Sequence, residues 1–263
     1  MTSPKLAAIT GASDGLGKEF ARQLAAEGYN LLVIARRPAL LYELKAELES
    51  KYSVQVEPLA WDLSKSDELK LVEDRLEKEE SLEMLVNNAG FGLCDAFPNV
   101  DPDKEESMIR LHAVAPMRLS RAALVPMCRR GKGYVINLAS VAAFLYGEHT
   151  AEYTATKAYV LTFSKSLQCD VRRYGVRVQA LCPGFTHTGF HSTESMEFFK
   201  KEATPRWLWL SAEYVVRTSL RSIRRTSRVV CIPSFRYKLI LGLLCNPLGD
   251  AMLGYFSGPG RKG

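Results

Sequence analysis

The chain has 263 residues, of which 47% are hydrophobic and 24% charged, and this composition excludes disordered and collagen-like proteins. The net charge is +6, but the basic residues form no long block, so we expect no nucleic-acid partner. The six cysteines show neither a C-x-x-C pair nor zinc-ligand spacing, which favours free thiols in the cytoplasm and predicts no metal site.

Short apolar runs, typical of buried parallel strands, alternate along the chain with longer amphipathic stretches. The expected strands are Leu6–Thr10, Leu31–Ala35, Val54–Ala60, Met84–Val86, Tyr134–Leu138, Val176–Leu181 and Val229–Ile232. The expected helices are Gly17–Glu27, Ala39–Lys51, Ser66–Lys78, Lys104–Cys128, Ala151–Arg173 and Ala212–Arg224. This alternation predicts an α/β fold, a doubly wound parallel sheet with helices on both faces, and one domain over residues 1–263. Ligands should bind at the carboxyl edge of such a sheet.

A glycine-rich turn, Thr10–Gly17, joins the first expected strand to the first helix. Gly11 allows a sharp turn, Gly15 lets the backbone approach a pyrophosphate, and Gly17 lets the helix pack close to the sheet. The N–H groups at the helix start would face the phosphate. The turn predicts a dinucleotide site, with an ordinary strand-to-helix turn as the alternative, and its other candidate contacts are Ser13, Asp14 and Leu16.

Arg36 and Arg37 follow the second expected strand, where an NAD site of this kind needs an acidic residue for the ribose 2′-hydroxyl. Two guanidinium groups suit a 2′-phosphate instead, which favours NADP(H), although a solvated pair is the alternative and Asp14 adds an opposing charge. Asp62, after the third strand, could accept a hydrogen bond from the adenine amino group or cap the next segment.

Small residues follow the fourth expected strand in the sequence Asn87–Gly90. Asn88, Ala89 and Gly90 would let the backbone lie against the ribose and nicotinamide, and an Asn amide can tie neighbouring strands together. A simple turn is the alternative interpretation.

Ser140 follows the fifth expected strand, and Tyr153 and Lys157 share one face of the helix that comes next. A free tyrosine titrates near pH ~10, but a neighbouring ammonium and a positive nicotinamide ring would lower its pKa. Tyr153 could then act as general acid or base, while Ser140 holds the substrate oxygen and Lys157 the nicotinamide ribose. An exposed Tyr/Lys pair is the default interpretation of this spacing in isolation.

Together with Pro183–Thr188, these motifs resemble those of the short-chain dehydrogenase/reductase family, most closely its NADP-dependent ketoreductases of steroid-like or acyl substrates and related bacterial reductases. The resemblance implies a Rossmann-type domain with a seven-stranded sheet, NADP(H) and a Ser-Tyr-Lys mechanism. It places Pro183 and Gly184 beneath the nicotinamide and Thr186 and Thr188 near its carboxamide or the phosphates. It also implies a homodimer or homotetramer that pairs through the helices Lys104–Cys128 and Ala151–Arg173.

His112 stands where the family usually has an Asn that supports a proton relay to the active-site Lys. An imidazole could hold the same water or relay a proton itself. Alternatively, a packed histidine would break the relay. A catalytically weak NADP-binding sensor is therefore an alternative to the enzyme.

Aromatic residues dominate the loops expected above the nicotinamide and predict a lipophilic carbonyl or alcohol substrate. The candidates for the pocket wall are Phe91, Phe144, Tyr146, Phe185 and Phe190. A lid over about 185–210 would add Met196, Phe198, Phe199, Trp207 and Trp209. The alternative is that some of these side chains only pack the domain or a subunit interface.

The C-terminal segment of about 235–256 is apolar, but no segment of the chain reaches the roughly 20 apolar residues of a membrane span. We expect this tail to close the pocket or cover a neighbouring subunit. Attachment to a membrane surface, which would make the chain a peripheral lipid ketoreductase, is the less favoured interpretation.

Overall fold

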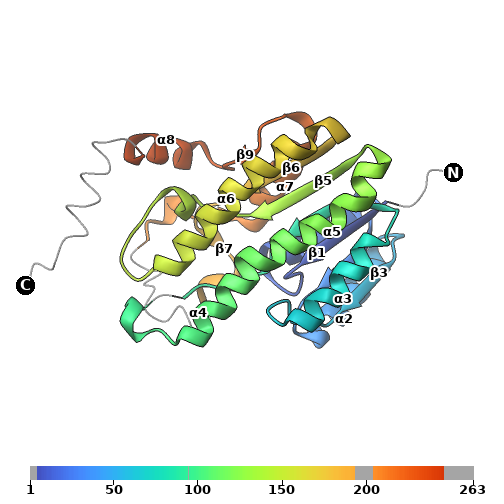
Figure 1. Cartoon of the computed structure of the whole chain (residues 1–263), viewed down its shortest axis with the longest axis horizontal. Helices are drawn as coiled ribbons and strands as arrows, with labels where there is room; N and C mark the ends of the chain where they lie inside the picture. The colour runs from blue at the N-terminus through green and yellow to red at the C-terminus, as the bar shows by residue number, and fades with distance from the viewer. Residues whose placement is uncertain (1–4, 94, 193–203, 246–263) are drawn as a thin grey trace, which may run out of the picture.

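A seven-stranded parallel sheet forms the centre of the computed structural model, which describes residues 5–93, 95–192 and 204–245 (Figure 1). The strands lie in the order β3-β2-β1-β4-β5-β6-β9, which confirms the predicted sheet. Their bounds are β1 Leu6–Thr10, β2 Asn30–Ile34, β3 Val56–Leu59, β4 Leu82–Asn87, β5 Gly133–Leu138, β6 Val176–Leu181 and β9 Val230–Cys231. The order reverses at β1, so the carboxyl ends of β1 and β4 border a crevice.

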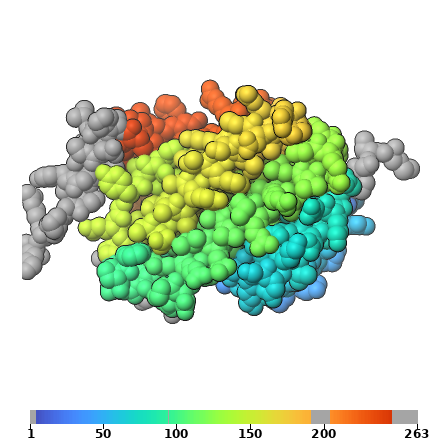
Figure 2. All heavy atoms as spheres, viewed as in Figure 1, coloured from blue at the N-terminus to red at the C-terminus, as the bar shows by residue number. Residues whose placement is uncertain are grey.

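Helices cover both faces of the sheet because successive strand residues point to opposite sides. Ala7 and Ile9 of β1 face one helical layer, whereas Leu6 and Ala8 face the other. The first layer holds α1 Gly15–Ala26, α2 Pro38–Lys51 and α7 Ala212–Arg225. The second holds α3 Ser66–Glu77, α5 Ala115–Arg130 and α6 Ala151–Val171. The last two lie side by side across one exposed face of the molecule (Figure 2).

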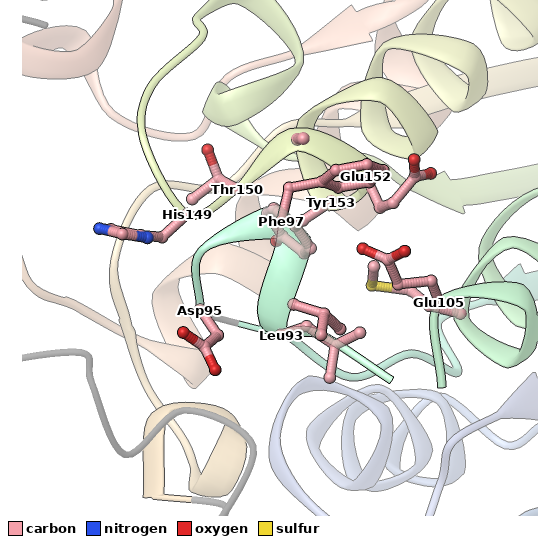
Figure 3. A pocket seen from close by; sticks show the side chains of 11 residues that line it. Leu93, Asp95, Phe97, Glu105, His149, Thr150, Glu152 and Tyr153 are labelled. Carbon is pink, nitrogen blue, oxygen red and sulfur yellow. The ribbon is translucent and has the colours of Figure 1, made fainter. Parts of the chain in front are cut away.

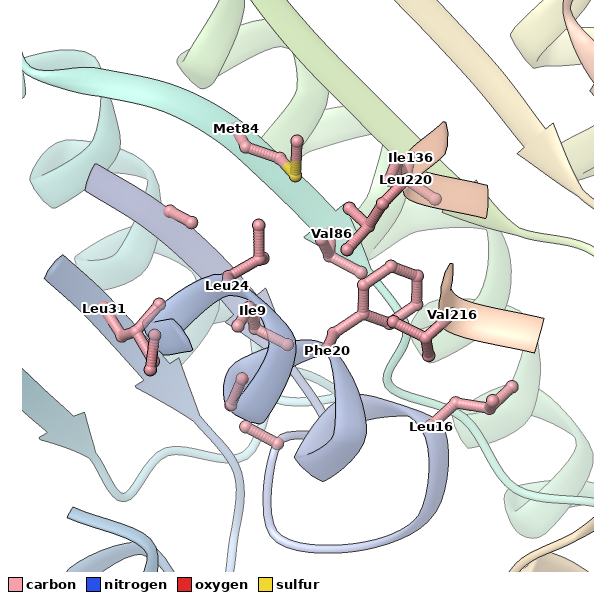
Figure 4. Packing of buried hydrophobic residues seen from close by; sticks show 14 of the residues in the cluster. Ile9, Leu16, Phe20, Leu24, Leu31, Met84, Val86, Ile136, Val216 and Leu220 are labelled. Atoms are coloured by element: carbon pink, nitrogen blue, oxygen red, sulfur yellow. The ribbon is translucent and has the colours of Figure 1, made fainter. Parts of the chain in front are cut away.

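The core of the first layer is closely packed around α1 (Figure 4). Phe20 and Leu24 are fully buried against Ile9, Val86 and other strand side chains. Removing a buried aromatic ring of this kind typically costs about 3–5 kcal/mol of folding stability. The core therefore holds the start of α1, and the glycine turn before it, in a fixed place.

One predicted helix, Lys104–Cys128, is divided in the structure. It consists of α4 Pro102–Ile109, a π-helical turn over Arg110–Val114, and α5. In an unbroken α-helix the N–H of residue 116 would bond the carbonyl of residue 112, but Pro116 has no N–H. The Ala115 N–H instead bonds the carbonyl of Arg110, five residues earlier. The apolar pattern runs through this break and so does not reveal it.

Two features of the C-terminal part lie outside the predicted pattern. The short strands β7 Thr186–His187 and β8 Leu210–Ser211 form a separate parallel pair. The helix α8 Phe235–Leu244 occupies the first part of the apolar tail. Among the residues that the structure describes, no helix combines the length and the apolar character needed to cross a bilayer.

Candidate active site

A cavity of about 950 Å³ opens at the carboxyl ends of the central strands. It brings together the segments that follow β1, β2, β3, β4, β5 and β6, which are far apart in the sequence. The sequence-predicted cofactor and catalytic residues that line it are Gly11, Ser13, Asp14, Gly15, Leu16, Arg36, Arg37, Asp62, Asn88, Ala89, Gly90, Ser140, Tyr153, Lys157, Pro183, Gly184, Thr186 and Thr188. Gly17 and His112 lie behind this wall.

The glycine turn is fixed by close backbone packing. Gly11 and Gly15 have φ values of +66° and +54°, a region that side chains other than glycine rarely adopt. A Cβ on Gly11 would lie 2.7 Å from Nδ2 of Asn88, and one on Gly17 would lie 2.6 Å from the same atom. The turn thus leaves its backbone open toward the cavity. Gly17 serves the packing of α1 and makes no part of the cavity wall.

The segment after β6 meets the same turn from the other side. A Cβ on Gly15 would lie 3.1 Å from Cβ of Thr188, and Gly189 lies directly against the Asp14 carboxylate. Asp14 caps α1, since its Oδ1 accepts a hydrogen bond of 2.6 Å from Gly15 N. A phosphate at this helix start would therefore lie between two backbone segments that are already in contact.

Two cations border the end of the cavity next to β2. Arg37 donates a hydrogen bond of 3.1 Å to the Ser13 hydroxyl, and Arg36 lies 4.0 Å from the Asp62 carboxylate. The other Asp62 oxygen accepts hydrogen bonds from the backbone and hydroxyl of Ser64, so this carboxylate caps its own turn. The Arg36 side chain is 68% exposed and can turn toward an anion in the cavity.

Hydrogen bonds tie the end of β4 to the glycine turn. Asn88 Nδ2 donates to the carbonyls of Thr10 and Gly11 at 2.9 and 3.2 Å. The Thr10 hydroxyl accepts from the backbone N–H groups of Asn88 and Ala89, both at 2.9 Å. An Asn side chain here does connect neighbouring strands, as the sequence suggested. The wall of the cavity between β1 and β4 is therefore rigid.

Ser140, Tyr153 and Lys157 meet in the middle of the cavity. The Tyr153 hydroxyl is hydrogen-bonded to Ser140, and Lys157 Nζ lies 5.6 Å from the centre of the Tyr153 ring. Lys157 is buried and donates a hydrogen bond of 2.9 Å to the Leu138 carbonyl. The three side chains thus come from the end of β5 and from the first turns of α6, as their sequence positions implied.

Burial dominates the electrostatics of this cluster in the chain alone. Burial raises the pKa of Tyr153 above its ordinary value of 10.0, and the hydrogen bond from Ser140 opposes that rise only in part. Burial also lowers the pKa of Lys157 from 10.5 to about 8. The expected lowering of the phenol pKa involves both the ammonium and a positive nicotinamide ring, and in the chain alone desolvation is the larger effect. Tyr153 is therefore protonated at neutral pH.

His112 is buried beside this cluster, in the π-helical turn. Its Nδ1 lies 3.1 Å from the Thr156 hydroxyl, and its Nε2 accepts a hydrogen bond of 3.2 Å from the Phe91 backbone. Burial first, and the charge of Lys157 second, hold its pKa well below 6.5. The ring meets the Tyr153 ring edge-on, at 5.9 Å between centres.

Tyr237 of α8 supports the Pro183–Phe185 turn, and sequence analysis did not single it out. Its hydroxyl accepts a hydrogen bond of 2.9 Å from the Phe185 N–H and donates one of 2.8 Å to the Leu208 carbonyl. Its ring fills the space that a Cβ on Gly184 would need. Ile240 and Leu241 of the same helix also line the cavity, so this part of the tail closes the pocket, as expected.

The end of the cavity away from the glycine turn is largely apolar. Four of the five expected wall residues line it: Phe91, Tyr146, Phe185 and Phe190. The placement expected of Phe144 is wrong, because its side chain packs against the buried cluster around Val160 and Leu161. Leu145, which belongs to the same loop and was also expected above the nicotinamide, does line the cavity.

Two further lid residues differ from expectation. Trp209 stacks on His187 at 5.0 Å between ring centres, Trp207 is 54% exposed, and neither lines the cavity. Met196, Phe198, Phe199 and the tail beyond Cys245 lie outside the described residues.

A second, much smaller pocket of about 30 Å³ also has Tyr153 in its wall (Figure 3). Glu105, Glu152 and Asp95 contribute carboxylates to its wall, and Leu93 and Phe97 contribute apolar side chains. The volume has room for about one water molecule. This pocket is too small for a cofactor or an organic substrate.

The short chain dehydrogenase family model matches residues 5–197. A very-long-chain 3-oxoacyl-CoA reductase of Danio rerio is 33% identical over 196 residues, which are 72% of this chain and 61% of that protein. The chain thus spans less than two thirds of that relative's length. An uncharacterized oxidoreductase of Staphylococcus saprophyticus is 31% identical over 185 residues, 70% of this chain and 79% of that one.

Solved structures of dehydrogenases also align with nearly the whole chain. A short-chain dehydrogenase from Sphingobium yanoikuyae in complex with NADPH aligns with a TM-score of 0.83 and 28% identity, over 98% of each chain. A bulky-bulky ketone specific alcohol dehydrogenase from Comamonas testosteroni aligns with a TM-score of 0.80 and 28% identity, over 100% of this chain and 97% of that one. The chain therefore belongs to the short chain dehydrogenase family of oxidoreductases.

Proposed function

We propose that this chain is an NADP(H)-dependent oxidoreductase that interconverts a carbonyl and an alcohol on a lipophilic substrate. The observation that carries the proposal is a single cavity with three parts: an open glycine turn flanked by cations, the Ser140–Tyr153–Lys157 cluster, and an apolar end. The NADPH complex of the Sphingobium relative supports the cofactor.

The residues at the β1–β2 end fit a phosphorylated dinucleotide. The turn at Gly11–Gly15 presents backbone N–H groups at a helix start, where a pyrophosphate binds favourably. Arg36 and Arg37 stand at the end of β2 and suit a 2′-phosphate. Asn88–Gly90 and Pro183–Thr188 would then enclose the nicotinamide half, with Lys157 on its ribose.

Tyr153 serves as proton donor for reduction and as acceptor for oxidation. NADP(H), when bound, would supply the hydride for reduction or take it up in oxidation. Ser140 holds the substrate oxygen by a hydrogen bond, and the Tyr153 phenol gives its proton to that oxygen as negative charge develops there. The protonated state that burial favours is the one needed for reduction. Lys157 stabilises the phenolate that remains.

The apolar end of the cavity favours a bulky hydrophobic substrate. Phe91, Phe185 and Phe190 form aromatic walls, and Ile240 and Leu241 of α8 add aliphatic surface. The names of two relatives, a very-long-chain 3-oxoacyl-CoA reductase and a bulky-bulky ketone specific alcohol dehydrogenase, agree with such walls. We therefore propose lipophilic ketones or 3-oxoacyl thioesters as the substrate class.

We also propose that two copies pair through α5 and α6, which lie together on one face (Figure 2). A groove of about 590 Å³ on this face is lined by Met117, Leu124, Phe163 and other apolar side chains. Light scattering should give the mass of a dimer or tetramer, and Phe163→Glu should give a monomer. A monomeric wild type would contradict this. From the length of the chain and the spacing of its cysteines, we propose a reducing, cytoplasmic setting.

The enzyme proposal is tested by NADPH oxidation against a panel of lipophilic ketones, aldehydes and 3-oxoacyl thioesters, with NADH measured in parallel. We expect turnover of bulky ketones with NADPH and at least tenfold weaker use of NADH, since one charge-assisted contact contributes about 1.5–3 kcal/mol. Equal use of NADH would contradict the role of Arg36 and Arg37. Tight NADPH binding without turnover of any compound would favour the sensor.

A second candidate, a reductase bound to a membrane surface, is favoured by the outer side of α8. Phe235 is 77% exposed and Leu239, one turn later, is 56% exposed, while Arg236 and Lys238 lie between them. Co-sedimentation with vesicles of anionic and of neutral lipid tests this candidate. Binding that is lost in Phe235→Ser/Leu239→Ser would support it, and equal recovery in the supernatant with both vesicles would exclude it.

A further inference from the structure

His112 connects two parts of the active site that are far apart in the sequence. On one side its Nε2 meets the backbone of Phe91, which follows β4 and forms part of the cavity wall. On the other side its Nδ1 meets the Thr156 hydroxyl, which in turn donates 2.9 Å to the carbonyl of Tyr153. The ring therefore lies between the loop expected to border the nicotinamide and the catalytic helix α6.

These contacts fix the tautomer of the ring. A backbone N–H can only donate, so Nε2 must present its lone pair to Phe91. The proton of the neutral imidazole is then on Nδ1, which donates to the Thr156 hydroxyl, and that hydroxyl donates onward to Tyr153. A second proton on Nε2 would point at the Phe91 N–H, so the contacts disfavour the charged ring.

The surroundings of the ring also exclude the charged form. His112 is 1% exposed, and the two titratable side chains that act on it are the ammonium of Lys157 and the phenol of Tyr153. Neither one can balance a positive imidazolium. Both ring nitrogens are occupied by protein atoms, so no nitrogen is left to bind a relay water.

Gly90 provides the space that the ring needs. A Cβ at this position would lie 2.6 Å from Nε2 of His112, closer than real Cβ contacts allow. The absence of a side chain at residue 90 and the presence of an imidazole at residue 112 are thus complementary. The π-helical turn at Arg110–Val114 carries the ring at this point.

We propose that His112 is a positioning residue, a neutral imidazole of fixed tautomer that holds the Phe91 loop and the Tyr153 turn at a set distance and relays no proton. The proposal rests on the proposed role of Tyr153. It deepens that role, because it assigns the orientation of the proton donor to a side chain that never touches substrate or cofactor.

The tautomer can be measured without any turnover. The full chain labelled with ¹⁵N-histidine gives separate nitrogen signals for its four histidines, and the His112→Asn variant identifies those of His112. We expect a protonated Nδ1 and an unprotonated Nε2 that do not titrate between about pH 5 and pH 9. A proton on Nε2, or titration near the ordinary pKa of 6.5, would overturn the proposal even if no substrate is known.

Two substitutions of His112 each remove one of its two contacts and keep the other. An Asn side chain reaches the place of Nδ1 and keeps the Thr156 contact, whereas a Gln side chain reaches the place of Nε2 and keeps the Phe91 contact. We expect each variant to lose about 5- to 100-fold in kcat/KM. The loss should appear mainly in KM for His112→Asn, which frees the cavity wall, and mainly in kcat for His112→Gln, which frees the Tyr153 turn.

Thr156 supplies the matched control. Thr156→Val should lower kcat as His112→Gln does and add little to it in the double variant, while Thr156→Ser, which keeps the hydroxyl, should restore activity. The pH profile should keep its shape in all of these variants. A new pKa in the profile of His112→Asn, or a larger solvent isotope effect on kcat with KM unchanged, would show a proton relay instead.

Discussion

The two ends of the cavity are built in different ways. At the cofactor end, the Thr10 and Asn88 side chains connect the end of β4 to the glycine turn through hydrogen bonds to backbone atoms. At the substrate end, aromatic and aliphatic side chains from loops and from α8 form the wall. The first arrangement fixes backbone atoms and suits an invariant ligand, whereas the second presents a surface that side-chain changes can reshape. The difference indicates that substitutions can weaken cofactor binding and substrate binding separately.

The largest expected effect on activity comes from substitution of Tyr153, which lies between the two ends of the cavity. Tyr153→Phe removes the proposed proton donor, so kcat should fall by about 10²–10⁴-fold. NADPH binding, measured by its fluorescence, should stay within about threefold of wild type, because neither end loses its walls. Tyr146→Phe, at another tyrosine of the cavity wall, is the control and should keep most of the activity. Comparable kcat values for the Tyr153 variant and wild type would remove Tyr153 from the mechanism.

Substitution at the cofactor end should affect NADPH alone. Arg36→Ala and Arg37→Ala should each weaken NADPH binding by about 10- to 100-fold and leave NADH binding unchanged, since only NADPH carries the 2′-phosphate. Calorimetric titration with both cofactors measures this. Arg22→Ala is a matched control, because Arg22 pairs with Glu47 outside the cavity. Equal weakening of both cofactors would mean that the arginines support the fold rather than the phosphate.

Substitution at the substrate end should affect the ketone more than the cofactor. Tyr237→Phe deletes the hydroxyl that accepts from Phe185 and donates to Leu208. We expect the free energy of unfolding to fall by about 1–3 kcal/mol and KM for the ketone to rise by about 5- to 10-fold. Tyr214→Phe removes a single hydrogen bond to Pro233 outside the cavity and should leave KM unchanged. A Tyr237 variant with altered NADPH affinity and normal KM would reverse the assignment of the two ends.

The smallest expected effect is a pH dependence of kcat/KM that arises from Lys157, which lies between the two ends. With a pKa of about 8, Lys157 is charged below that pH and loses its proton above it. Because the charged form stabilises the phenolate, kcat/KM for NADPH, which reports groups of the free enzyme, should fall about threefold between pH 7.5 and pH 8.5. Lys157→Arg stays charged, so its profile should lack this decline. A wild-type profile that is flat through this range would exclude a titrating Lys157.

Sequence analysis could predict the cofactor end because its signals are local. Continuous apolar runs defined the strands, and the turns at Gly11–Gly17 and Asn88–Gly90 lie directly at strand ends. The break before Pro116 was not predicted, because it concerns backbone hydrogen bonds and leaves the apolar pattern intact. The burial that raises the Tyr153 pKa in the chain alone was also not predicted, because burial is a property of the assembled cavity.

The substrate end could be predicted only in part. Phe144 and Leu145 are adjacent apolar residues, and nothing in their order tells which one faces the cavity. Tyr237 contacts a turn more than 50 residues earlier, a distance that no local pattern encodes. The His112 contacts could not be predicted for the same reason, although the small residue at position 90 and the hydroxyl at position 156 are visible in the sequence.

The central claim is that a hydride passes from the nicotinamide to a carbonyl carbon held beside Tyr153. The most direct measurement is a reaction of wild type with NADPH that carries deuterium at the transferable position, followed by mass spectrometry of the alcohol formed from a bulky aryl ketone. The account predicts one deuterium on the carbinol carbon of the product and almost no product with Tyr153→Phe. Alcohol without deuterium, or equal yields from the two proteins, would contradict it.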